Sequence, residues 1–167
     1  GGARFHCWKK GGHGRLSMID GIKHSCDVYF YDVARRVGID AIAAMAKRLG
    51  LGQLTGIDLP GERPGLIPSS DWKKATLGEP WYPGETLVAG IGQGYITATP
   101  LQLALMTARL ANGGHEIVPH VTRNGRADPL EDWPILANLD PTAGPMVAPV
   151  VSAAPSLGIS EAHLKVV

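Results

Sequence analysis

A hydroxyl and a carboxylate lie two residues apart in Ser25-Cys26-Asp27, at the predicted start of a helix. A serine in that place can relay a proton, and the nearby carboxylate can hold the amide of a substrate. The structural alternative is that Ser25 or Asp27 caps the helix by accepting hydrogen bonds from its free N–H groups. The spacing alone leaves both interpretations open and favours the cap.

The only two cysteines, Cys7 and Cys26, combine with His13 into a second group. Thiolate and imidazole are good zinc ligands, but a tetrahedral site needs four donors and this group has three. Weaker candidates for the fourth donor are His6, Asp20 and His24. A Cys7–Cys26 disulfide or a pair of free thiols would fit the same residues. From the residue types, a metal site, a disulfide and free thiols all stay open.

A third group, Ser70-Asp71-Trp72-Lys73, matches the S-x-x-K pattern, in which a lysine amine lies one helical turn from a nucleophilic serine. A pattern with two fixed positions often occurs by chance. This example also follows Pro68 in a stretch that is predicted to be irregular. We therefore expect the match to be a coincidence.

Three classes of ligand are excluded: nucleic acid, anionic membranes and dinucleotides. Sixteen Lys and Arg against 15 Asp and Glu give a net charge of +1, without the basic stripe that nucleic acid or an anionic membrane requires. The segment Gly90-Ile91-Gly92-Gln93-Gly94 lacks the last glycine of a dinucleotide-binding loop, which would fall on Tyr95. Its glycines are expected to allow close backbone packing.

The elements that must position these groups are mostly helices. Helices are predicted over 16–23, from Ser25 or Asp27 to Val37, over 41–49 with Asp40 as N-cap, from Pro100 after the N-cap Thr99 to Gly113, and from Glu161 after Ser160. Short strands are predicted over 86–91 and 116–123. Because Gly and Pro number 22 and 13, residues 51–70 are expected to be irregular, and 124–160 irregular or partly disordered. The pattern predicts an α+β domain that lacks part of its sheet.

Five longer strings occur together and cover roughly residues 6 to 120. They are Trp8–Gly14, Ser25–Tyr31, Thr55–Pro60, Gly90–Gln102 and Leu110–Gly114. On these strings the chain resembles the transpeptidase domain of class B penicillin-binding proteins, closest to the penicillin-binding protein 2 group of the elongation machinery. The resemblance implies a penicilloyl-serine transferase fold, in which an antiparallel sheet lies between helical regions.

The resemblance also implies a function. Such enzymes are serine-type D,D-transpeptidases of the D-Ala-D-Ala carboxypeptidase class, which cross-link peptidoglycan stem peptides through an acyl-serine intermediate in cell-wall elongation. They are targets of β-lactams and are anchored at the periplasmic face of the inner membrane. The partners implied are stem peptides ending in D-Ala-D-Ala, a lipid-II-polymerising glycosyltransferase and elongation scaffold proteins. Nucleic acid is not among them.

Three motifs line the cleft in this family: S-x-x-K, then S-x-N or S-x-D, then K-T-G or K-S-G. Only the second is present, as Ser25-Cys26-Asp27, and Ser70–Lys73 lies on its wrong side to supply the nucleophile. By the resemblance Ser25 and Asp27 are catalytic. An ionised Asp27, unlike the more frequent Asn, can only accept hydrogen bonds. We expect residues 1–167 to be the central part of one transpeptidase domain, inactive by itself.

The resemblance shifts the interpretation of the cysteine group towards a structural zinc site, with no cofactor required for the chemistry. His13 and Cys26 fit the spacing of a zinc site found beside the S-x-D motif in some elongation-type members, and Cys7 falls where a carboxylate ligand would be. The remaining ligand is expected upstream of Gly1. The alternative function is a non-catalytic, metal-stapled module that docks cell-wall partners.

Overall fold

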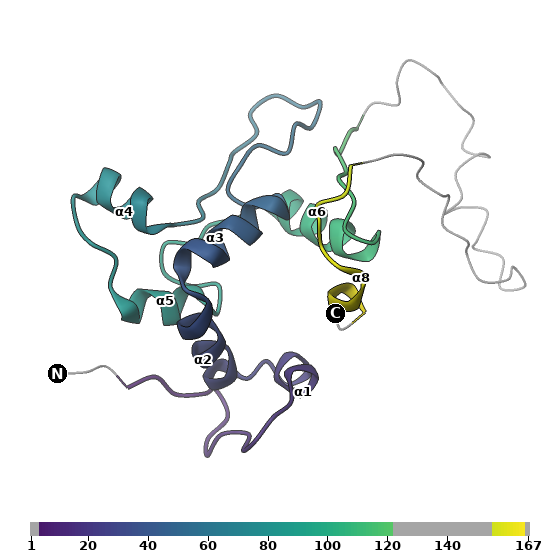
Figure 1. Ribbon diagram of the computed structural model, residues 1–167. Helices are drawn as coiled ribbons and strands as arrows, with labels where there is room; N and C mark the ends of the chain where they lie inside the picture. Colours follow the sequence, from purple (N-terminus) through teal and green to yellow (C-terminus); the bar gives the residue numbers. More distant parts are fainter. Residues whose placement is uncertain (1–3, 122–154, 166–167) are drawn as a thin grey trace, which may run out of the picture.

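The computed structural model describes residues 4–121 and 155–165, which are mainly helical (Figure 1). The helices are α1 (Met18–Lys23), α2 (Asp27–Val37), α3 (Ile39–Arg48), α4 (Ser70–Leu77), α5 (Pro83–Ala89), α6 (Pro100–Ala111) and α8 (Glu161–Leu164). Isolated β-bridges join Leu66 to Thr97 and His115 to Ser156, and the described ranges contain no longer strand. None of the described helices has the length and apolarity needed to cross a membrane.

Most of the predicted helices are confirmed. Local signals determine α6, because Thr99 accepts a hydrogen bond from the Gln102 N–H and Pro100 occupies the first helical position. Ser160 likewise precedes α8 and caps it. The prediction that Asp40 caps the third helix is wrong. That helix begins at Ile39, and the Asp40 carboxylate accepts hydrogen bonds from the N–H and hydroxyl of Ser70, both at 2.9 Å.

Both predicted strands are wrong within the described residues. Residues 86–89 end α5, because Pro83 begins that helix and the Glu85 carboxylate accepts a hydrogen bond from the Tyr82 N–H. Burial of Thr86 and Ala89 then outweighs the strand propensity of the segment. Residues 116–121 contain no strand. The irregular segment predicted over 124–160 lies largely outside the described residues. The segment predicted to be irregular over 51–70 is so up to residue 69, and Ser70 instead begins α4.

Helix α2 packs on α3 and, more extensively, on α5, which lies beside the α2–α3 junction (Figure 1). The crossing is close because Gly90, directly after α5, has no side chain. A Cβ atom there would lie 2.3 Å from the Cβ of Ala34 and 3.3 Å from the Phe30 carbonyl oxygen. Ala34 is itself buried in α2. The small size of both residues therefore sets the distance between the two helices.

Buried polar side chains attach α6 to the irregular segments. Gln102 is fully buried, and its Nε2 donates to the carbonyls of Gln53 and Pro64, both at 2.7 Å. Its Oε1 accepts from the Thr99 N–H at 3.0 Å. The first turn of α6 therefore binds both ends of the 53–64 segment through Gln102. It supplies hydrogen-bond partners for the carbonyls of Gln53 and Pro64.

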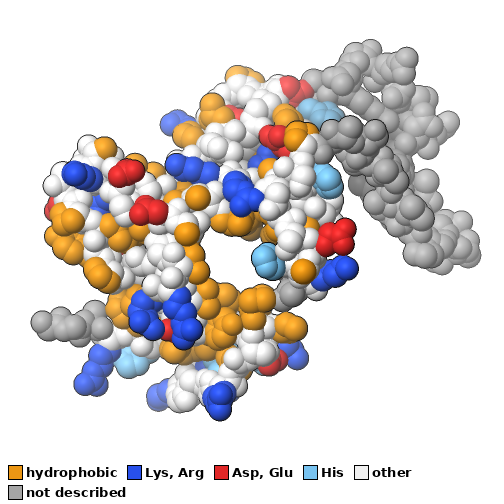
Figure 2. Space-filling view, in the orientation of Figure 1, with side chains coloured by type: hydrophobic (Ala, Val, Ile, Leu, Met, Phe, Trp, Pro, Cys, Tyr) orange, Lys and Arg blue, Asp and Glu red, His pale blue; other side chains and the backbone are white. Residues whose placement is uncertain are grey.

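A considerable part of the apolar surface is uncovered. Exposed large hydrophobic residues include Met18, Ile19, Ile22, Val28 and Val37. Figure 2 shows hydrophobic side chains gathered along the rim of a gap between the part with α1 and α2 and the part with α6 and α8. An exposed apolar area of this kind marks a surface that packs against another structural layer. The mostly helical architecture is that of a partial domain.

Replacing Gly90 with alanine should destabilise the protein by about 1–3 kcal/mol, because the added methyl group cannot fit against Ala34. Urea denaturation of the purified protein measures the change. Gly84→Ala is the matched control, since a Cβ there meets only the Phe5 ring at 4.0 Å. Equal effects of the two substitutions would contradict the packing argument.

Candidate functional site

The Ser25-Cys26-Asp27 motif forms the turn between α1 and α2. Ser25 has φ of +47°, and it is the one non-glycine residue with positive φ among those described. The turn is fixed from the α1 side, because the Ser25 N–H donates to the Ile22 carbonyl and the Cys26 N–H to the Gly21 carbonyl, both at 3.0 Å. The Ser25 side chain is thereby exposed, while Cys26 is 4 % exposed.

The expected helix cap is not formed by either side chain of the motif. The N-cap residue of α2 is Cys26, and it makes no side-chain cap hydrogen bond. Asp27 is the first helical residue, and its Oδ2 accepts a hydrogen bond from the Trp8 N–H at 2.9 Å. The structural interpretation of Ser25 and Asp27 as caps is therefore wrong.

The two polar groups of the motif are open to a ligand. Within the described ranges the structure gives neither the Ser25 hydroxyl nor Oδ1 of Asp27 a hydrogen-bond partner. A hydroxyl in this state can accept and pass on a proton, and a carboxylate oxygen can accept from a substrate amide. The negative charge of Asp27 also lies at the N-terminal end of α2, where the helix dipole favours it.

Cys7, His13 and Cys26 come together, as the sequence predicted for a metal site. Their ligand atoms all lie within 4.8 Å of one another, and Cys7 Sγ is 3.4 Å from His13 Nδ1. A tetrahedral zinc ion with bonds of about 2.0–2.3 Å separates its nitrogen and sulfur ligands by about 3.5 Å. A cavity of about 320 Å³ adjoins all three residues. Both cysteines are free thiols, so the disulfide alternative is not formed.

The protonation properties of this group suit a metal ligand set. Burial by itself raises the pKa of the Cys7 thiol, but hydrogen bonds from the Lys9, Asp27 and Val28 backbone and from Cys26 outweigh it and hold the pKa below its ordinary value. Burial and the charge of Lys9 lower the pKa of His13. A thiolate and a neutral imidazole are the forms that bind zinc.

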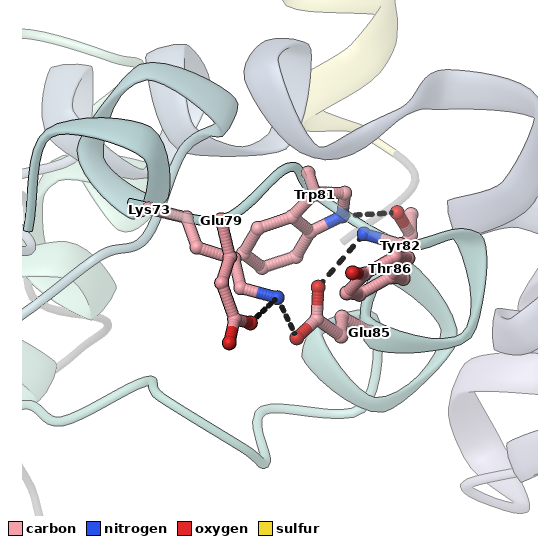
Figure 3. A network of polar contacts seen from close by, with 6 residues as sticks. All are labelled: Lys73, Glu79, Trp81, Tyr82, Glu85 and Thr86. Carbon is pink, nitrogen blue, oxygen red and sulfur yellow. Dashed lines mark hydrogen bonds and ion pairs between the residues drawn. The ribbon is translucent and has the colours of Figure 1, made fainter. Parts of the chain in front are cut away.

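Lys73, the lysine of the S-x-x-K match, lies in a network of structural contacts (Figure 3). Lys73 is 1 % exposed, and its Nζ lies 2.6 Å from Glu85 Oε1 and 3.5 Å from Glu79 Oε2. The ammonium also lies 4.4 Å from the centroid of the Tyr82 ring. This ion pair joins α4 to the first turn of α5, and the Ser70 hydroxyl donates to Asp40.

The ion pair shifts the pKa values of both Lys73 and Glu85. Burial alone would lower the pKa of Lys73, but the hydrogen bond and charge of Glu85 raise it above its ordinary value. Burial alone would raise the pKa of Glu85, and the Lys73 ammonium together with the Tyr82 N–H brings it below its ordinary value. Both groups are therefore charged near neutral pH.

Sequence reasoning missed one contributor to the site, Trp8, and one structural contact, the Lys73–Glu85 pair. Trp8 contacts the motif from 17 to 19 residues away, through an irregular segment whose path no local pattern determines. An isolated lysine in a short helix gives no sign of burial. The one available signal for Trp8 was its place in the Trp8–Gly14 string.

The sequence matches the family model described as the penicillin binding protein transpeptidase domain over residues 1–143. The chain belongs to this transpeptidase family. Among curated members, it is 50 % identical over 120 residues to the peptidoglycan D,D-transpeptidase MrdA of Acinetobacter baumannii, a match covering 72 % of the chain and 18 % of that relative. The chain thus spans about a fifth of the length of this transpeptidase.

Solved transpeptidase structures share the fold. Pseudomonas aeruginosa PBP2 in complex with WCK 5153 aligns with a TM-score of 0.67 at 53 % identity, covering 68 % of this chain and 26 % of that one. Helicobacter pylori PBP2, in its complex with MreC, aligns with a TM-score of 0.71 at 37 % identity, covering 77 % and 24 %. The predicted fold, an incomplete penicilloyl-serine transferase domain, is confirmed.

Because its pKa in the folded protein is lowered, Glu85 contributes stability above its ordinary pKa of 4.5 and loses it as pH falls through the lowered value. We expect the urea midpoint of the purified chain to fall less between about pH 6 and about pH 3.5 in Glu85→Gln than in the unaltered chain. The variant should be the less stable one at about pH 6, since the buried Lys73 then keeps only the more distant carboxylate of Glu79. Identical pH slopes would contradict a charged Glu85.

Proposed function

We propose that this chain supplies the proton-relay part of the active site of a peptidoglycan D,D-transpeptidase that cross-links stem peptides in cell-wall elongation. The observation that carries the proposal is the open hydroxyl of Ser25 beside the free oxygen of Asp27, on a turn held from both sides. Membership of the transpeptidase family and the D,D-transpeptidase relatives support it.

In the proposed reaction a serine in another part of the domain attacks the carbonyl of the D-Ala-D-Ala bond, with a neighbouring lysine as its base. Ser25 passes a proton to the nitrogen of the departing D-Ala. Oδ1 of Asp27 accepts a hydrogen bond from the amide of the acyl chain, while Oδ2 stays on the Trp8 N–H. Backbone N–H groups outside this chain stabilise the oxyanion. A β-lactam would acylate the same serine.

The proposal places the nucleophile outside this chain. The printed sequence contains no K-T-G or K-S-G, and its one S-x-x-K match is held in the structural contacts of Ser70 and Lys73. We therefore propose that these 167 residues are inactive alone. The whole enzyme would act at the periplasmic face of the inner membrane, where its peptidoglycan substrate lies.

The proposed partners follow from the substrate and from the relatives. Stem peptides ending in D-Ala-D-Ala and β-lactams would bind beside Ser25 and Asp27. The Helicobacter pylori relative forms a complex with MreC, which supports an elongation scaffold as a partner. A glycosyltransferase that polymerises lipid II would supply the strands to be cross-linked.

We also propose a structural zinc ion held by Cys7, His13 and Cys26. The 3.4 Å approach of Cys7 to His13 and the adjoining cavity support it, with a fourth donor from outside the group. Because Cys26 is the middle residue of the motif, a metal there would fix the backbone on which Ser25 and Asp27 stand. The metal would have no part in the bond-making steps.

In the whole enzyme, Ser25→Ala should lower the rate of acylation by a fluorescent penicillin by about 10²–10⁴-fold, because the proton relay is lost. The matched control is Ser70→Ala, which removes the serine of the S-x-x-K match and should leave acylation unchanged. The isolated 167-residue chain should show no covalent label in a gel. Labelling of that chain, or loss of labelling in Ser70→Ala, would refute the assignment, and an intact enzyme that never labels would favour the docking module.

Metal analysis of the purified enzyme should find about one zinc ion per chain, falling to near zero in Cys26→Ser. His163→Gln is the control, because His163 is an exposed histidine of α8 that does not join the ligand group. Absence of zinc together with a disulfide between Cys7 and Cys26 would contradict the proposal.

A further inference from the structure

Trp8 is bound to the catalytic motif through both of its N–H groups. Its indole Nε1 donates to the carbonyl oxygens of Ser25 at 3.0 Å and His24 at 3.2 Å. Its backbone N–H donates to Oδ2 of Asp27 at 2.9 Å. One residue therefore contacts both ends of the three-residue motif.

The indole N–H binds the backbone at Ser25, the residue whose φ is +47°. The left-handed conformation of Ser25 is unfavourable for a residue with a side chain and persists only where the surroundings hold it. The α1 side fixes the N–H of Ser25 through the Ile22 carbonyl. Trp8 fixes the carbonyl of the same residue from the opposite side. The direction of the Ser25 hydroxyl depends on both contacts.

The backbone contact acts on the second group of the motif. With Oδ2 of Asp27 held by the Trp8 N–H, the carboxylate cannot rotate freely about its side-chain bonds. Its other oxygen is then presented in one direction. Trp8 thus couples the orientation of the proton relay at Ser25 to that of the amide acceptor at Asp27.

Within the described residues, hydrogen bonds and ring contacts rather than core packing hold this tryptophan, since 67 % of it is exposed. Its ring meets His13 edge to face, with centroids 5.4 Å apart, and His13 stacks on His24 at 5.6 Å. These contacts orient the indole so that Nε1 faces the turn. The indole is thus held by its polar atom on the motif and by its ring on His13.

We propose that Trp8 is a positioning residue for transpeptidation, which sets the geometry of Ser25 and Asp27 through its indole and backbone N–H groups. The inference rests on the proposed function. It assigns to Trp8 no contact with the reacting atoms. The indole N–H acts on the rate of bond formation, because Ser25 acts as the leaving nitrogen departs. The contact to Asp27 is made by the backbone N–H, which a substitution of the side chain retains.

The test is Trp8→Phe in the whole enzyme, which keeps the ring and removes the indole N–H. The first-order acylation step with a labelled penicillin should slow by about tenfold, as expected for the loss of one shared hydrogen bond at the reacting group. The non-covalent dissociation constant and the melting temperature should remain near those of the unaltered enzyme. Trp81→Phe is the matched control, since its indole N–H donates to Thr86 at 2.8 Å (Figure 3) and acylation should be unchanged.

An unchanged acylation step in Trp8→Phe, or an equal loss in Trp81→Phe, would overturn the inference. So would a loss of acylation that merely follows a lower melting temperature. Failure of the proposed function is recognised separately, because it would appear as full activity in Ser25→Ala. A crystal structure of Trp8→Phe with Ser25 moved out of its left-handed conformation would support the inference directly.

Discussion

The contact between Gly90 and Ala34 is the constraint on which the rest of this structure depends. It brings α5 onto α2 at a distance that no larger residue permits. The S-x-D motif leads directly into α2, whose first residue is Asp27. The position of α2 against α5 therefore determines where the motif lies. At its other end α5 is joined to α4 by Lys73 and Glu85, so an ion pair remote from the motif belongs to the same framework. Helix packing fixes α2, and hydrogen bonds then fix the turn before it.

In the described segments, side chains bind many of the backbone N–H and carbonyl groups that neighbouring strands would pair in a complete sheet. The irregular segments of the described chain have two isolated bridges, and their remaining backbone groups need other partners. Gln102 supplies three hydrogen bonds, Arg109 binds the carbonyls of Arg48 and Ile117, and Glu62 accepts from the Thr55 and Gly56 N–H groups. These contacts define the path of the irregular segments within the described residues, where no sheet is formed.

What could be predicted from the sequence depended on how local the physical cause is. The Thr99 cap with Pro100 lies within four residues, and α6 was predicted correctly. The start of α5 depends on Glu85, whose carboxylate is shared with a lysine 12 residues away, and the segment was predicted as a strand. At the site, residue types and spacing were enough to select Ser25, Asp27 and the cysteine–histidine group. Residue types and spacing did not predict the contacts of Trp8 with the motif, because these contacts depend on the path of a loop.

The three hydrogen bonds of Gln102 limit how this region can diverge. Glutamate at that position would be unable to donate, lysine would be unable to accept, and asparagine would be one methylene too short to reach both carbonyls. None of these three exchanges preserves the contacts to Gln53, Pro64 and Thr99. Each would therefore require a compensating change in the loop between residues 53 and 64 or in the first turn of α6.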